Sequence, residues 1–205
     1  MPELPEVETI RRQLAPLVEG RVLTRLGISD PRWCLPLTPE AMVDALTDAS
    51  VPVHAVGKIR DLFAEVGIGE AHPGATNAIA VASLDRLVDG LDRGLAFANL
   101  VETDQVYGHR KDVEGFHGAL REIDAATAQW LALLRDDDLL VLTADHGVDP
   151  AAPHTDHTRE YVPLLAVVPG LPGARHDGAL ADVGASVHRW LTATDAPGIA
   201  GTSFL

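Results

Sequence analysis

The sequence predicts an α/β fold, because short runs rich in β-branched and aliphatic residues alternate with stretches of helical periodicity. The chain has 205 residues and is 46% hydrophobic, which is enough for one sizeable core or for a core with a small appendage. No apolar run approaches the roughly 18 residues of a membrane-spanning helix. We therefore expect a globular protein that does not cross a membrane.

The helical and strand patterns succeed one another from residue 51 onwards. Strands are expected at residues 51–57, 95–102, 139–143 and 163–170, and helical segments at 59–66, 83–94, 113–135 and 181–191. The longest helix carries an apolar stripe formed by Phe116, Leu120, Ile123, Trp130 and Leu134. The nearly all-apolar run 139–143 is typical of a central strand that is covered on both faces.

Charge and cysteine content narrow the range of partners and compartments. The net charge of -14 disfavours binding to the phosphates of nucleic acids. It favours binding of a cation instead. The single cysteine, Cys34, excludes an internal disulfide and a cysteine-based zinc finger. The N-terminus carries acidic residues where a secretory signal would carry basic ones. We expect a cytoplasmic protein.

Two of the predicted strands each deliver an aspartate into the loop at the strand's carboxyl end. Asp104 follows the first and is succeeded by His109, and Asp145 follows the second and is succeeded by His146 and later by His157. Ligands bind at this edge in open α/β sheets. Carboxylate oxygen and neutral imidazole nitrogen suit divalent ions such as manganese or zinc. Five such ligands imply two ions.

A packing explanation accounts poorly for this pattern. Grouped carboxylates at the end of a buried strand would repel one another unless a cation held them. A lone histidine, by contrast, is more often a hydrogen-bonded or surface residue than a ligand. We therefore expect the remaining histidines to be hydrogen-bonded or surface residues and not ligands: His54, His72, His117, His154, His176 and His188.

Four stretches carry a family resemblance: "VPVHAVGKIRDLFAEVGI", "NLVETDQVYGHRKD", "LLVLTADHGVDP" and "TDHTREYVPLL". They resemble the C-terminal core of phosphopentomutases, which belong to the alkaline phosphatase superfamily, over about residues 42–205. The resemblance implies a doubly wound core with two Mn²⁺ ions. It implies that Asp104, His109 and His157 bind one ion and that Asp145 and His146 bind the other. The implied reaction, in nucleotide metabolism, moves phosphate between C1 and C5 of ribose or deoxyribose through an enzyme phosphothreonine.

The sequence also departs from that family. The family's N-terminal segment, with a metal-binding aspartate and the nucleophilic threonine, has no counterpart in these residues, and most of the substrate-binding cap is missing. No catalytic residue for the mutase reaction is retained. We therefore expect an impaired isomerase acting on pentose phosphate, with one or two Mn²⁺ ions and with unidentified substrate-binding residues. The first alternative is a non-catalytic, metal-binding chimeric fragment.

The front of the chain carries a different resemblance. "MPELPEVETIRRQLAPLVEGR" resembles the N-terminus of formamidopyrimidine-DNA glycosylases over about residues 1–43. This implies that removal of Met1 would expose Pro2 as a secondary amine, which would attack the sugar carbon while Glu3 handles protons. A lesion glycosylase acting through Pro2 is therefore the second alternative, although the four-cysteine zinc finger and the DNA-binding helices of that family are missing.

The two resemblances divide the chain into a short helix and strand arm over residues 1–43 and an incomplete metal-binding core over 44–205. A doubly wound sheet without its first strands exposes an unpaired edge and an apolar face. Either the arm covers that edge or the chain self-associates, and the sequence favours neither outcome.

Overall fold

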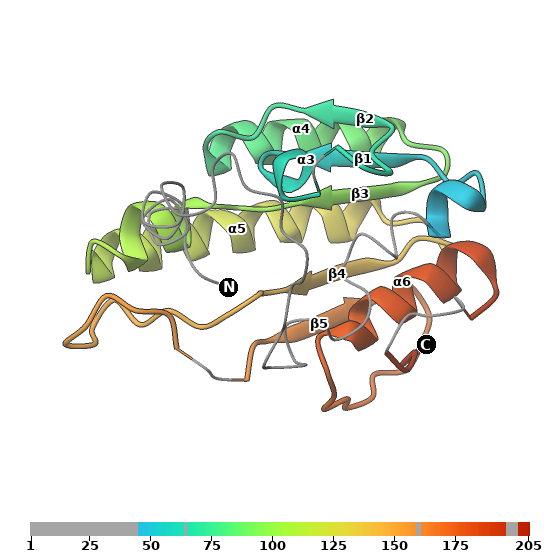
Figure 1. Ribbon diagram of the computed structural model, residues 1–205. Helices are drawn as coiled ribbons and strands as arrows, with labels where there is room; N and C mark the ends of the chain where they lie inside the picture. The colour runs from blue at the N-terminus through green and yellow to red at the C-terminus, as the bar shows by residue number, and fades with distance from the viewer. Residues whose placement is uncertain (1–44, 64, 159–160, 196–200) are drawn as a thin grey trace, which may run out of the picture. The chain divides into compact units, whose positions relative to one another are not determined.

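The computed structural model describes residues 45–63, 65–158, 161–195 and 201–205 (Figure 1). The predicted arm over residues 1–43, with Pro2, Glu3 and Cys34, lies outside the described residues. The elements are, in chain order, β1 (Val53–Val56), α3 (Ile59–Leu62), β2 (Glu70–His72), α4 (Asn77–Gly90), β3 (Leu95–Ala98), the π-helical turn η2 (Thr103–Gly108), α5 (Val113–Leu133), β4 (Leu140–Thr143), β5 (Leu164–Val167) and α6 (Ala181–Thr192). Strands and helices alternate, which confirms the predicted α/β class.

The described region contains a parallel sheet of three strands with the order β2-β1-β3. Successive side chains of a strand point to opposite faces. Val53 and Ala55 of β1 therefore face one side, where they pack with Ile59 of α3 and with Val187 of α6. Val56 faces the other side and packs against α4 and α5. Helices thus cover both faces of the sheet, as in a doubly wound core.

Helix α5 packs on the sheet with a slightly different face from the predicted one. Trp130 is 4% exposed and its indole N–H donates to Asp85 Oδ1 of α4 over 2.7 Å. The prediction that Leu120 belongs to the buried stripe is wrong, because this residue is 46% exposed. Ala119 and Ala126 are buried instead. The small alanines allow the helix to lie close to its neighbours, so the buried face is centred on them. No helix in the described part of the chain is long and apolar enough to cross a membrane.

Strands β4 and β5 form a separate antiparallel pair. The prediction that residues 139–143 form a central strand covered on both faces is wrong for the described region. The strand begins at Leu140, pairs there with β5 alone, and its first three side chains are only half-buried while Thr143 is exposed. An apolar run indicates that a strand is hydrophobic, but it does not indicate how many strands pair with it. That number depends on segments that are distant in the sequence.

Gly57 marks the end of β1, where the chain passes close to the loop after β2. It has a φ of +70°, and a Cβ atom added there would lie 3.0 Å from the carbonyl oxygen of Gly74. Its N–H donates to the carbonyl of His72 over 3.2 Å. Glycine is required at this position because both the left-handed backbone and the close approach exclude a side chain. The contact fixes how β1 and β2 end.

Candidate metal centre

Four of the predicted ligands come from segments that follow or precede strands. Asp104 lies in η2, shortly after β3, and His109 is the first residue beyond η2. His146 follows β4 by three residues, and His157 lies in the connection from β4 to β5. The predicted strand 95–102 is shorter than expected and ends at Ala98. The chain then turns into η2, which places Asp104 on a helical turn instead of an extended loop.

Backbone contacts hold these segments together. The N–H of Gly147 donates to the carbonyl of Thr158 over 3.2 Å, and the N–H of Thr158 donates back to Gly147 over 2.8 Å. This pair of hydrogen bonds sets His146 beside His157, because each histidine is the immediate neighbour of a bonded residue. Lys111 Nζ adds a hydrogen bond to the carbonyl of Pro153 over 2.7 Å, which joins the region after η2 to the same connection.

The ligand atoms of the cluster converge within a few ångströms. Asp104, His146 and His157 offer ligand atoms that lie within 4.8 Å of one another. The Nε2 atoms of His109 and His157 lie 3.3 and 3.2 Å from Asp104 Oδ1, and 3.1 Å from each other. Ligand atoms bound about 2.1 Å from one ion lie roughly 3.0–3.4 Å apart in octahedral or tetrahedral geometry. These separations therefore fit a shared ion.

Asp104 shows a second sign of a cation site. Its Oδ1 atom is buried and has no hydrogen-bond partner in the part of the chain that the structure describes. The two imidazole nitrogens lie at ion-pair distance from this oxygen but do not meet hydrogen-bond geometry. A buried carboxylate oxygen without a hydrogen bond costs several kcal/mol unless a charge compensates it. The residues present thus fit a divalent cation.

The orientation of His109 follows from its partner. Its Nδ1 atom lies 2.8 Å from the carbonyl oxygen of Thr155, which can only accept a hydrogen bond, so Nδ1 carries the proton. In neutral imidazole the other nitrogen then presents a lone pair. Nε2 is the atom that points to Asp104 and His157. Such a carbonyl partner is the usual support of a metal-binding histidine.

The predicted second pair of ligands, Asp145 and His146, differs in burial and in contact with the cluster. The His146 ring stacks on His157, with ring centroids 3.6 Å apart and an angle of 17° between the rings. The Asp145 side chain is 76% exposed, and its Oδ1 lies 3.6 Å from His146 Nε2. The structure therefore places His146 within the cluster and Asp145 on its solvent side. A separate second ion held by Asp145 and His146 stays a prediction.

A further group of possible ligands was missed by sequence reasoning. His54 of β1 and Glu70 and His72 of β2 offer ligand atoms within 4.8 Å of one another. The Glu-x-His spacing on a strand was a readable signal, because residues i and i+2 share a face. The sequence does not show that this strand pairs with β1, so His54 could not be recognised as the third ligand of the group.

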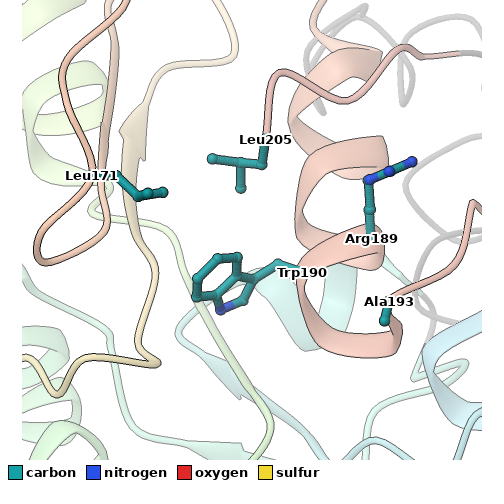
Figure 2. Close-up of a pocket in the computed structure, with 5 residues that line it drawn as sticks. All are labelled: Leu171, Arg189, Trp190, Ala193 and Leu205. Atoms are coloured by element: carbon teal, nitrogen blue, oxygen red, sulfur yellow. The ribbon is translucent and has the colours of Figure 1, made fainter.

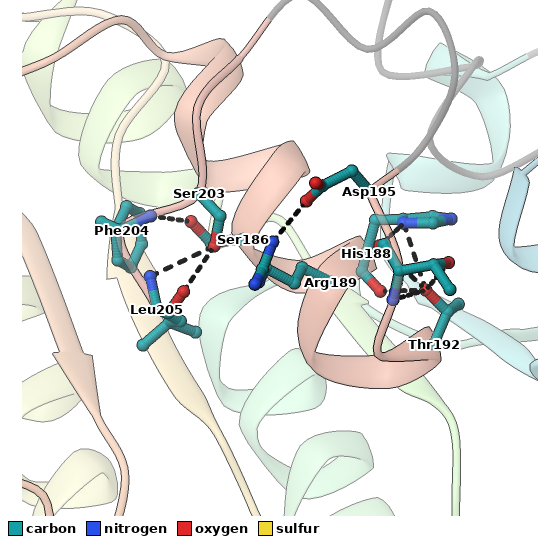
Figure 3. A network of polar contacts seen from close by, with 9 residues as sticks. Ser186, His188, Arg189, Thr192, Asp195, Ser203, Phe204 and Leu205 are labelled. Carbon is teal, nitrogen blue, oxygen red and sulfur yellow. Dashed lines mark hydrogen bonds and ion pairs between the residues drawn. The ribbon is translucent and has the colours of Figure 1, made fainter.

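The pocket beside α6 has a different character. It has a volume of about 350 Å³ and is lined by Leu171, Arg189, Trp190, Ala193 and Leu205 (Figure 2). Arg189, the charged residue among these five, is paired with Asp195 over 2.6 Å (Figure 3). The nearby polar contacts, including the hydrogen bond from the Phe204 N–H to Ser186 Oγ, attach the C-terminal residues to α6 (Figure 3).

Comparison with known proteins agrees with the metal-centre geometry. Residues 41–194 match the Metalloenzyme superfamily. The chain belongs to the metalloenzyme superfamily. This metalloenzyme chain is also similar to phosphopentomutases: it is 41% identical to one from Anaeromyxobacter sp. (strain Fw109-5) over 189 residues, and 45% identical to one from Syntrophotalea carbinolica over 175 residues. The aligned regions cover 86% and 80% of the chain but 49% and 45% of those relatives, so the chain spans about half their length.

A second match lies at the front of this metalloenzyme chain. Residues 1–72 match the N-terminal domain of formamidopyrimidine-DNA glycosylases, which confirms the resemblance seen in the sequence. That match extends beyond residues 1–43, which carry the resemblance in the sequence alone. It overlaps the metalloenzyme match over residues 41–72, because one begins at 41 and the other ends at 72. The described part of the overlap contains β1 and β2.

Proposed function

We propose that Asp104, His109, His146 and His157 hold a divalent cation, with Mn²⁺ as the expected ion. The observation that supports this most directly is the buried Asp104 Oδ1, which accepts no hydrogen bond from the described residues and is faced by two imidazole nitrogens. Mixed carboxylate and imidazole ligands suit Mn²⁺ and Zn²⁺. Asp145, at the solvent side, is proposed as a further ligand when a second ion binds.

The proposed reaction class is phosphoryl transfer on a pentose phosphate, by analogy with the similar phosphopentomutases. A bound cation would supply Lewis-acid stabilisation of phosphoryl oxygens. The protein residues orient that centre: the carbonyl of Thr155 fixes the tautomer of His109, and the Gly147 and Thr158 bridge fixes His146 beside His157. We also propose that the chain is cytoplasmic. The unpaired sheet edge expected from the sequence is either covered by the N-terminal arm or pairs with a second copy of the chain, and sedimentation of the purified protein distinguishes the two.

The 205-residue chain by itself is expected to be a poor mutase. Its sequence contains no segment that resembles the family's nucleophilic threonine region, and it spans about half the length of the similar phosphopentomutases. Transfer of phosphate between C1 and C5 needs a group that accepts and returns the phosphate. We therefore propose that metal binding is retained while mutase turnover is weak or absent. If mutase turnover is absent altogether, the chain is a non-catalytic, metal-binding chimeric fragment, which is the first alternative.

The glycosylase alternative rests on the match of residues 1–72. Pro2 and Glu3 would be its reactive groups. The strongly acidic chain, with a net charge of -14, does not favour binding to DNA. Borohydride trapping of a covalent adduct with an oxidised-purine oligonucleotide would support this alternative, and a Glu3→Gln variant, which lacks the proposed proton-handling carboxylate, provides the matched control.

The first experiment measures Mn²⁺ binding by the size-homogeneous full chain, using calorimetry and metal analysis after gel filtration. The Asp104→Ala/His157→Ala variant is compared with His117→Gln, which alters an exposed histidine of α5. The proposal predicts at least one bound ion, lost in the double variant and kept in the control. Equal binding by all three proteins would disprove the assignment. Mutase and phosphatase assays on the loaded protein then separate a weak enzyme from a metal-binding fragment.

A further inference from the structure

A second candidate metal site lies on the parallel sheet and uses none of the ligands discussed above. His54 of β1 pairs in register with Glu70 of β2, and Val56 pairs with His72. Partners in register on parallel strands share a face, and so do residues two apart on one strand. His54, Glu70 and His72 therefore all project from the same face of the sheet. Strand pairing, and not a flexible loop, sets the positions of the three side chains.

The distances among these side chains fit one small cation. His54 Nδ1 lies 3.1 Å from His72 Nε2, and 3.7 Å from Glu70 Oε2. Glu70 Oε1 lies 3.9 Å from His72 Nε2. Ligand atoms about 2.0–2.2 Å from a tetrahedral Zn²⁺ are roughly 3.3–3.6 Å apart. The observed separations bracket this range, so small side-chain rotations complete the geometry.

Burial and charge favour an exchangeable ion at this position. The side chains of His54 and His72 are 15% and 16% exposed, while that of Glu70 is 62% exposed. The two imidazoles are thus largely shielded, and the carboxylate closes the solvent side and gives an entry path. The carboxylate also supplies negative charge beside two neutral nitrogen ligands. Three protein ligands leave one position open, which is the pattern of zinc sites that bind a further ligand.

The surrounding backbone supports the arrangement. His72 is fixed on one side by the Gly57 N–H, which donates to its carbonyl. Next along the chain, the carbonyl of Pro73 accepts a hydrogen bond from Ser83 Oγ of α4 over 2.8 Å. On the other side of β1, the register partner of His54 is Ala96 of β3, whose small side chain leaves room for the imidazole. The histidine pair is therefore held on a rigid scaffold, which is the condition for a preorganised site.

We propose that His54, Glu70 and His72 form a zinc-binding site with an open coordination position. The site does not depend on the proposed function of the Asp104 cluster, because the two sets share no residue. A simple hydrogen bond between His54 and His72, with Glu70 as an ordinary surface acid, is the competing explanation. It predicts no dependence of zinc affinity on Glu70.

The test isolates this site in the full chain by first removing the other one. In an Asp104→Asn/His157→Gln background, Zn²⁺ affinity is measured by competition with a chromophoric chelator, and Co²⁺ absorption reports the coordination number. We expect one ion with tetrahedral Co²⁺ bands, a loss of at least tenfold in affinity on Glu70→Gln, and loss of binding on His72→Gln. Exposed Glu122 and His117 of α5 provide the matched controls Glu122→Gln and His117→Gln, which should bind as the background does.

Thermal unfolding separates a damaged fold from a missing ligand. The exposed Glu70 side chain is not part of a buried core, so Glu70→Gln should unfold at the temperature of its background without zinc. With zinc, the background should gain stability that the variant does not gain, because a ligand that binds only the folded state raises the unfolding temperature. Zinc affinity unchanged by Glu70→Gln and His72→Gln, or no zinc binding in the background, would overturn the proposal.

Discussion

Asn77 and Glu102 exchange two hydrogen bonds and so join the start of α4 to the segment that leads into η2. The backbone N–H of Asn77 donates to Glu102 Oε2 over 2.7 Å, and the backbone N–H of Glu102 donates to Asn77 Oδ1 over 3.2 Å. Asn77 is 2% exposed, so its N–H has little access to water. Because Glu102 precedes Asp104 by two residues, this pair positions the backbone that carries the carboxylate of the proposed metal site.

The first prediction concerns Glu102. Glu102→Ala removes the acceptor of a buried N–H, and we expect a loss of about 1–3 kcal/mol in unfolding free energy together with a Mn²⁺ affinity several-fold weaker. Glu102→Gln keeps an acceptor oxygen and should lose much less of both. Glu114→Ala, an exposed acid in the first turn of α5, is the control. Chemical denaturation and calorimetry measure the two effects. Unchanged Mn²⁺ affinity in Glu102→Ala would show that η2 holds Asp104 without this contact.

The second prediction concerns Asp104 and separates affinity from stability. Asp104→Asn removes the negative charge from a buried oxygen that accepts no hydrogen bond among the residues the structure describes, and the new amide can donate to a facing imidazole nitrogen. The metal-free variant should therefore unfold at the same temperature as the parent chain or at a higher one. Its Mn²⁺ affinity should fall at least a hundredfold. Differential scanning calorimetry with and without Mn²⁺ measures both. A variant that is clearly less stable without metal would indicate that Asp104 has a structural partner instead.

The third prediction concerns the packing of η2 on the connection after β4. A Cβ atom at Gly108 would lie 2.8 Å from Val148 Cγ2 and 2.9 Å from the carbonyl oxygen of Thr103. Gly108→Ala should therefore displace η2, lower the unfolding temperature by several degrees and weaken Mn²⁺ binding. Adding Val148→Ala should restore part of the affinity, since the Thr103 contact remains. Gly118→Ala, with nothing within 4 Å of the new Cβ, should instead stabilise α5. Full Mn²⁺ affinity in Gly108→Ala would refute this coupling.

The sequence could predict features that depend on local patterns. Helix α5 begins at the predicted residue, Val113, where Asp112 accepts a hydrogen bond from the N–H of Gly115. The Asp and His residues at strand ends were likewise visible, because ligand types and strand ends can both be read locally. The structure brings four of the five predicted ligands together in one cluster, and their division between two ions, which the family resemblance implies, stays a prediction.

Features that depend on pairing between distant segments could not be predicted. The run at β4 looked central, yet its described neighbour is β5 alone, since apolar content does not specify how many strands pair. Val101 continues the apolar pattern of β3, but it is buried beyond the end of the strand, next to η2. His54 was interpreted as an ordinary histidine because Glu70 and His72 become its neighbours only through the register of β1 and β2.

The last prediction concerns Asp182 in the first turn of α6. The N–H of Thr202 donates to its Oδ1 over 2.8 Å, and His176 Nε2 lies 2.8 Å from its Oδ2. The hydrogen bond from Thr202 and the contacts with His176 and Ala179 hold the pKa of this carboxyl below its usual value, although burial opposes the shift. Asp182→Asn should destabilise the chain by about 1–3 kcal/mol at neutral pH, because these partners lose a charged acceptor.

The lowered pKa fixes the pH dependence of that loss. A carboxyl whose pKa is lower in the folded state stabilises the fold above its unfolded pKa of about 3.9, and this stability disappears as the pH falls through the folded pKa. The difference between the parent chain and Asp182→Asn should therefore be constant from pH 5 to 7, about one unit or more above that value, and should shrink below pH 4. Urea unfolding at each pH measures it, with the exposed Asp177→Asn as the control. A difference that grows on acidification would contradict the role assigned to the Asp182 carboxylate.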